Sequence, residues 1–99
     1  MGLIRVTASQ LRTAAGEIRS LNGQFKSQVG NLEAGEGTLA SQWEGEAKNA
    51  FHKAFLDDKA KWEEFYKLIE EYCIRLEEIA KKYEEAENRT TSIATTRKA

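Results

Sequence analysis

The stretch SQWEGEAKNAFHKAF, residues 41–55, lies near the middle of a 99-residue chain that contains no proline. It places the large ring of Trp43 two residues before Gly45, a residue that breaks helices. Gly45 can adopt a backbone conformation that is costly for other residues, and the Trp43 ring can cover the open end of a seam between two helices. Trp43 could equally be an ordinary core residue of a loop. In both interpretations the pair is structural, and we predict a turn over residues 40–45.

The segment before this turn has the apolar period of an amphipathic helix. The apolar residues recur every seven positions, at Ile4, Leu11, Ile18, Phe25, Leu32 and Leu39. Thr7 and Gln10 have the spacing of a capping box, in which each side chain bonds the backbone amide of the other residue. We therefore predict a helix over about residues 8–39.

The segment after the turn carries a stronger apolar pattern, again at a seven-residue spacing. One series is Phe55, Trp62, Ile69, Leu76 and Tyr83, and a second series beside it is Phe51, Phe65, Tyr72, Ile79 and Ala86. We predict a helix over about residues 46–88 with both series in its seam. Residues 89–99 lose this period and are rich in Thr, so we expect a disordered tail.

Two helices of these lengths, roughly 48 and 65 Å at 1.5 Å per residue, have no core unless they pack together. The expected fold class is all-α: an antiparallel two-helix hairpin that forms a single domain over residues 1–99. A lone domain of this size buries only about 60 to 65 % of its unfolded surface. We therefore expect the hairpin to dimerise into a four-helix bundle.

Charged residues offer a check on the hairpin. A basic row consists of Arg5, Arg12, Arg19 and Lys26, and an acidic row consists of Glu63, Glu70, Glu77 and Glu84. When the rows are paired from the outside inward, as 5 with 84, 12 with 77, 19 with 70 and 26 with 63, every midpoint falls between residues 44 and 45. Each exposed pair contributes at most ~1 kcal/mol, so the rows would select the register of the hairpin. Alternatively, both rows are solvated faces.

Small residues line the side of the first helix roughly opposite its seam of Leu, Ile and Phe residues. Gly16, Gly23 and Gly30 are spaced by seven, and Ser20 and Ser27 lie between them. Because a glycine inside a helix costs about 1 kcal/mol relative to alanine, several on one stripe favour a close approach by another helix. We predict that Gly16, Ser20, Gly23, Ser27 and Gly30 form a dimer interface. The alternative is a solvated stripe on a marginal helix.

The composition argues against several classes of function. Fifteen basic and sixteen acidic side chains give a net charge of −1, which does not favour a nucleic-acid partner. No apolar run is long enough for a cleaved signal peptide or for stable membrane insertion. His52 and Cys73 are single residues about 31 Å apart along one straight helix, so they form neither a catalytic dyad nor a metal site. We expect no catalytic, cofactor-binding or metal-binding residues, and we expect a buried, inert Cys73 thiol.

A chain of about 100 residues with two amphipathic helices and a central Trp43-Glu44-Gly45 resembles the WXG family of small type VII secretion substrates, the early-secreted-antigen-like proteins. A second feature also matches this family. Tyr83 is followed four residues later by Glu87, as in the secretion signal of the family. The two side chains would lie one turn apart on one helix face, although Tyr83 also continues the apolar seam.

The resemblance implies a non-enzymatic protein that is cytoplasmic before export and is then secreted without a cleaved signal peptide. The expected partners are the type VII secretion ATPase and its machinery, together with either a second copy of the chain or a sister WXG-type protein. The protein would be an effector, a partner that carries another substrate out, or a structural part of the export process. Two other classes remain open: a cytosolic coiled-coil adaptor and a membrane-active amphipathic protein.

Overall fold

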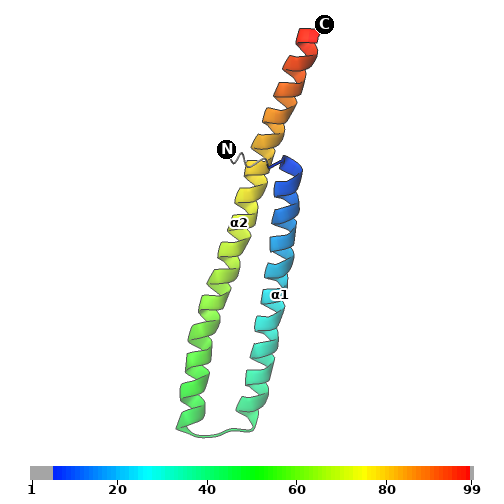
Figure 1. The fold of residues 1–99 in the computed structure, drawn as a ribbon. Coiled ribbons are helices and arrows are strands. Elements are labelled where there is room, and N and C mark those ends of the chain that lie inside the picture. The colour runs from blue at the N-terminus through cyan, green and yellow to red at the C-terminus, as the bar shows by residue number, and fades with distance from the viewer. Residues whose placement is uncertain (1–5, 99) are drawn as a thin grey trace, which may run out of the picture.

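The computed structural model describes the backbone of residues 6–98 and the side chains of residues 6–89. Two helices, α1 (Ala8–Ser41) and α2 (Glu46–Lys98), lie antiparallel and form a rod of 81 × 22 × 21 Å (Figure 1). The described residues contain no strand. The predicted all-α hairpin is therefore confirmed. Ile4, Arg5 and Ala99 lie outside the described residues.

The start of α1 is fixed by the predicted capping box. The Thr7 hydroxyl accepts a hydrogen bond from the Gln10 amide at 3.1 Å, and the Thr7 amide donates to Gln10 Oε1 at 3.0 Å. At the other end α1 runs two residues beyond the expected residue 39 and ends at Ser41. Gly35 and Gly37 lie inside this helix, because an isolated glycine weakens a helix without ending it.

The turn occupies residues 42–45 and depends on Gly45. This residue has a φ of +110°, in the left-handed region that L side chains rarely adopt. Its carbonyl accepts a hydrogen bond from the Asn49 amide at 3.2 Å, which opens α2 at Glu46. The half-buried Trp43 ring packs against the Phe51 ring, with 5.8 Å between the ring centroids.

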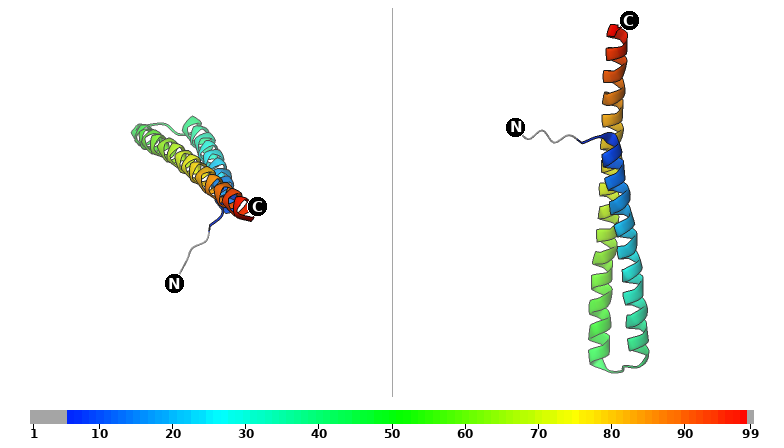
Figure 2. Two further views of the ribbon diagram at one scale, coloured as in Figure 1. Left: turned by 90° about the horizontal axis from the view of Figure 1, so that it is seen from above. Right: turned by 45° about the vertical axis from the view of Figure 1, so that its right-hand side comes forward.

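The two helices are closest at the end away from the turn. The residues buried between them are small: Ala8, Ala15 and Asn22 of α1, with Cys73 and Ala80 of α2. Nearer the turn the seam contains the aromatic rings of Phe25, Phe55 and Trp62, which hold the backbones farther apart. Figures 1 and 2 show the resulting wedge, narrow where α1 begins and wide at the turn.

The predicted seam of α2 is partly wrong. The series that begins at Phe55 faces α1, but the column beside it in the seam contains Cys73 and Ala80. The second predicted series is instead exposed, at Phe51, Phe65, Tyr72 and Ile79. A single neighbouring helix covers only a narrow stripe with spacings of three and four residues. Cys73 and Ala80 occupy that stripe because they allow a closer approach of the backbones than Tyr72 and Ile79.

The predicted tail also differs from the structure, since α2 continues to Lys98. The loss of the apolar period after residue 88 removes packing partners, but it does not remove the backbone hydrogen bonds of the helix. No glycine or proline follows Gly45 to interrupt them. α2 therefore projects beyond the start of α1 as a single helix (Figure 1).

We predict that Gly45→Ala and Gly35→Ala change stability in opposite directions. No atom lies within 4 Å of a Cβ built at either position, so both effects are conformational. Gly45→Ala should lower the free energy of unfolding by about 1 kcal/mol or more, because alanine is strained at positive φ. Gly35→Ala, inside α1, should raise it by up to ~1 kcal/mol. Urea titrations followed by circular dichroism would measure both, and an unchanged or more stable Gly45→Ala chain would contradict the assigned turn.

Candidate functional site

One long side of the hairpin is closed by charged side chains and one histidine that bridge the two helices. Arg12 pairs with Glu84, and the Arg19 Nη2 lies 2.8 Å from Glu77 Oε1. Nearer the turn, Lys59 pairs with Glu33, and His52 Nδ1 lies 2.5 Å from Glu36 Oε1. We call this side the charged face.

The charged pairs are shifted by one heptad from the predicted register. Arg12 meets Glu84 instead of Glu77, and Arg19 meets Glu77 while its Nε lies 3.8 Å from the predicted partner Glu70. The shift arises because side chains lean toward the N-terminus of their own helix. In antiparallel helices the Arg and Glu side chains therefore lean toward each other, and each Arg reaches a Glu farther along α2. The ammonium of Lys26 lies over the Tyr66 ring, 5.2 Å from its centroid.

The opposite long side exposes large apolar side chains. Leu21 of α1 is 62 % exposed and Phe65 of α2 is 51 % exposed. They flank a groove of about 210 Å³ whose lining also includes Ile18, Phe25 and Ile69. Tyr72 and Ile79 continue the column of Phe65 along α2 and are also exposed. We call Leu21, Phe65, Tyr72 and Ile79 the apolar face.

The predicted small-residue stripe lies away from α2. Gly16, Ser20, Gly23, Ser27 and Gly30 are all exposed. No atom lies within 4 Å of a Cβ built at Gly16, Gly23 or Gly30. The stripe is therefore not used in packing the hairpin, and its role as a dimer interface stays a prediction.

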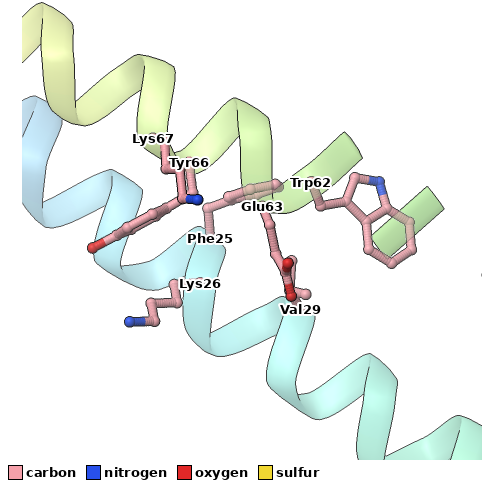
Figure 3. Close-up of a pocket in the computed structure, with 7 residues that line it drawn as sticks. All are labelled: Phe25, Lys26, Val29, Trp62, Glu63, Tyr66 and Lys67. Atoms are coloured by element: carbon pink, nitrogen blue, oxygen red, sulfur yellow. The ribbon is translucent and has the colours of Figure 1, made fainter. Parts of the chain in front are cut away.

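A further cavity of about 280 Å³ opens on the charged face, where the aromatic residues hold the helices apart (Figure 3). It is lined by Phe25, Lys26, Val29, Trp62, Glu63, Tyr66 and Lys67. Tyr66 and Lys26 lie together at one end, and the Trp62 ring extends from the other (Figure 3). Neither His52 nor Cys73 lines this cavity, and Cys73 is fully buried elsewhere in the seam.

The turn motif and the predicted secretion signal lie at opposite ends of the hairpin. Trp43 and Gly45 form the turn, whereas Tyr83 and Glu87 lie on α2 beside the start of α1. The Tyr83 side chain is 45 % exposed. Glu87 Oε1 accepts a hydrogen bond from the backbone amide of Ala8 at 3.4 Å. The segment of the predicted signal is therefore in contact with α1.

Sequence reasoning missed Asn22, the one buried polar residue among the described side chains. Its amide nitrogen donates to the Tyr66 carbonyl at 3.0 Å and to Glu70 Oε2 at 2.8 Å. A satisfied polar group inside a helical seam favours one register over others. The sequence does indicate that Asn22 is buried, because Asn22 shares a seven-residue column with Ala8 and Ala15.

Two kinds of site were not found in the part of the chain that the structure describes. No group of His, Cys, Asp and Glu side chains there is arranged to hold a metal ion. No described helix combines the length and the apolar character required to cross a membrane.

The fold and the turn together define a small helical-hairpin protein with a Trp-X-Gly connection. The family described as proteins of 100 residues with WXG matches residues 3–89. The chain therefore belongs to the WXG100 family, as its resemblance to that family predicted. No curated protein matches the sequence.

Two solved structures illustrate the similarity. The secreted protein EsxB of Bacillus anthracis str. Sterne is 26 % identical, with a TM-score of 0.78, and the match covers 88 % of this chain and 99 % of EsxB. EsxA of Geobacillus thermodenitrificans is 23 % identical, with a TM-score of 0.81, and the match covers 91 % of this chain and 98 % of EsxA. The second comparison shows the fold alone.

We predict that the Arg19–Glu77 pair makes stability depend on pH. The hydrogen bond from Arg19, followed by its charge, lowers the pKa of Glu77 below its ordinary value of 4.5. A carboxylate with a lowered pKa stabilises the fold above the unfolded pKa and loses this effect as the pH falls through the folded pKa. Arg19→Gln should therefore lower the melting temperature at pH 7, and its difference from the unmodified chain should shrink toward pH 3.

Arg75→Gln is the matched control, because the Arg75 guanidinium lies over the Tyr72 ring, 6.0 Å from its centroid. The change that Arg75→Gln causes in the melting temperature should therefore be the same at pH 7 and at pH 3. Thermal melts at several pH values would measure both variants. A difference for Arg19→Gln that stays constant from pH 7 to pH 3 would contradict the predicted coupling.

Proposed function

We propose that this chain is a substrate of a type VII secretion system, and that it acts by associating with other helices and not by catalysis. The observation that carries the proposal is a WXG100 hairpin with Tyr83 and Glu87 one turn apart beside its open end. The description of the similar EsxB as a secreted protein supports it. In this proposal the chain is cytoplasmic before export and leaves the cell without a cleaved signal peptide.

The exposure of Tyr83 supports its role as a signal. Tyr83 continues the column of Phe55, Trp62, Ile69 and Leu76, which faces α1. Unlike those half-buried residues, Tyr83 is exposed, because it lies level with the beginning of α1 and less of that helix covers it. An aromatic ring and a carboxylate one turn apart form a small surface that the secretion ATPase could read.

The apolar face supports association with a partner. Exposed columns of large apolar residues on soluble proteins commonly mark interaction sites. Leu21, Phe65, Tyr72 and Ile79 would be buried if a second hairpin packed against them, which would give a four-helix bundle. The partner would be a second copy or a sister WXG-type protein. The small-residue stripe is a second proposed surface, predicted from the sequence.

We predict that Tyr83→Ala and Glu87→Ala each abolish export while the helical circular dichroism is retained. The cause would be loss of the ring or of the carboxylate that the machinery reads. Glu85→Ala is a matched control, since it removes an exposed carboxylate from the same turns of α2. The measurement is the secreted fraction of each chain from a bacterium with a type VII system. Normal export of the Tyr83 and Glu87 variants would reject these residues as the signal, whereas retention of the unmodified chain inside the cell would favour the cytosolic adaptor.

A second prediction separates the two proposed interfaces. Sedimentation equilibrium across a dilution series would compare the unmodified chain with Phe65→Gln/Tyr72→Gln and with Gly23→Gln/Gly30→Gln. Loss of two aromatic contacts from an interface core should raise the dimer dissociation constant by about tenfold or more. An unchanged constant in the glycine variant would reject the stripe, and an unchanged constant in the aromatic variant would reject the apolar face. A monomeric unmodified chain would instead favour a sister protein as partner.

A further inference from the structure

Among the described residues, two contacts join the open end of the hairpin to the segment that carries the proposed export signal. Ala8, the first residue of α1, donates its backbone N–H to Glu87 Oε1 at 3.4 Å. Arg12, one turn further along α1, forms an ion pair with Glu84. Both contacts join the first two turns of α1 to the segment of α2 that carries Tyr83 and Glu87.

The Ala8 amide has a physical reason to hold the Glu87 carboxylate. The first four amides of a helix have no partner within the helix. In α1 the Thr7 hydroxyl satisfies the Gln10 amide, and the Thr7 carbonyl accepts from the Leu11 amide. The capping box therefore leaves the Ala8 amide to an acceptor from elsewhere, and Glu87 supplies one. A carboxylate at this position is also favoured by the helix dipole.

The two halves of the signal differ in their contacts with α1. Both Tyr83 and Glu87 are exposed, but one carboxylate oxygen of Glu87 is bonded to the Ala8 amide. A receptor that reads both side chains has to take Glu87 away from the Ala8 amide. The same receptor also meets the first turn of α1, because that turn lies directly beside the signal (Figure 1).

We infer that the first turn of α1 is a latch on the export signal. The receptor engages Tyr83 and competes with the Ala8 amide for the Glu87 carboxylate, so that opening of the bond from Ala8 to Glu87 Oε1 favours recognition. Export then depends on residues of α1 that are outside the signal itself. This inference rests on the proposed role of Tyr83 and Glu87.

Two substitutions at Thr7 test the latch without removing the helix cap. Asp and Asn are both effective at the N-cap position, so Thr7→Asp and Thr7→Asn should both preserve α1. Only Asp places a second negative charge beside the Ala8 amide, where it repels Glu87. The initial export rate would be measured from a bacterium with a type VII system, at expression levels where export is proportional to the amount of chain.

The Asp variant should be exported about two to five times faster than the Asn variant, as expected for one exposed charge interaction. Equal rates, or a slower Asp variant, would overturn the latch. Thermal melts of the two variants would verify that both retain the helical fold.

Hydrogen exchange at the Ala8 amide tests the contact itself. Glu87→Ala should increase the exchange rate of this amide by about two- to fivefold, because its acceptor is removed. Glu85→Ala, which removes a neighbouring carboxylate, should leave the rate unchanged. If Glu87→Ala does not alter the exchange rate, the contact does not hold Glu87 in solution and the latch is wrong.

The export measurements distinguish failure of the latch from failure of the proposed function. If Tyr83→Ala and Glu87→Ala are both exported normally, the signal is wrong and the latch falls with it. If both variants lose export while the Thr7 variants are exported equally, the signal stands and only the latch is rejected.

Discussion

Small side chains buried between two helices are the constraint on which the rest of this hairpin depends. Ala8 and Ala15 of α1, with Cys73 and Ala80 of α2, let the backbones approach closely at the end away from the turn. The larger rings of Phe25 and Trp62 separate the helices toward the turn and leave a cavity of about 280 Å³ on the charged face. Because a two-helix seam is narrow, it buries only one stripe of each helix. The remaining apolar residues must stay exposed or be covered by a partner.

The narrow seam gives the hairpin two different long sides. On one side, cross-helix pairs such as Arg12–Glu84 and Arg19–Glu77 satisfy charges within the chain. On the other side, Leu21 and Phe65 flank an apolar groove, and Tyr72 and Ile79 extend it. This asymmetry favours association through one side. The same seam determines where α1 begins relative to α2, and hence which residues of α2 lie beside the Ala8 amide. The contact between Ala8 and Glu87 is thus a consequence of the register.

Features that depend on local chemistry could be predicted from the sequence. The capping box of Thr7 and Gln10 and the positive φ of Gly45 both follow from neighbouring residues. The family, too, could be recognised from Trp43 and Gly45 in a chain of this length. The pairing of Arg12 with Glu84 was missed because the expected pairs were chosen by residue number alone, symmetrically about the turn. That choice neglects the direction of side chains in a helix, which point toward the N-terminus of their own helix. The exposure of Tyr72 and Ile79 was missed because α2 has more apolar columns than one neighbouring helix can cover. The column of small side chains, Cys73 and Ala80, is buried in place of the column of Tyr72 and Ile79. The bond from Ala8 to Glu87 joins residues 79 positions apart, and no local pattern indicates it.

The wedge shape is tested most directly by measuring two distances across the hairpin. Spin labels at Thr13 and Glu78 report the open end, and labels at Ala34 and Asp57 report the turn end. All four positions are exposed, and within each helix the two labelled positions are equivalent in the seven-residue repeat. Double electron–electron resonance would be recorded on chains carrying one pair, with Cys73 replaced by alanine and with an excess of unlabelled chain to suppress distances between molecules. Small residues at the open end predict a shorter separation for Thr13 and Glu78 than for Ala34 and Asp57. Equal separations would show that the distance between the two antiparallel helices is constant along their length. This result would contradict the packing on which the apolar face and the proposed latch depend.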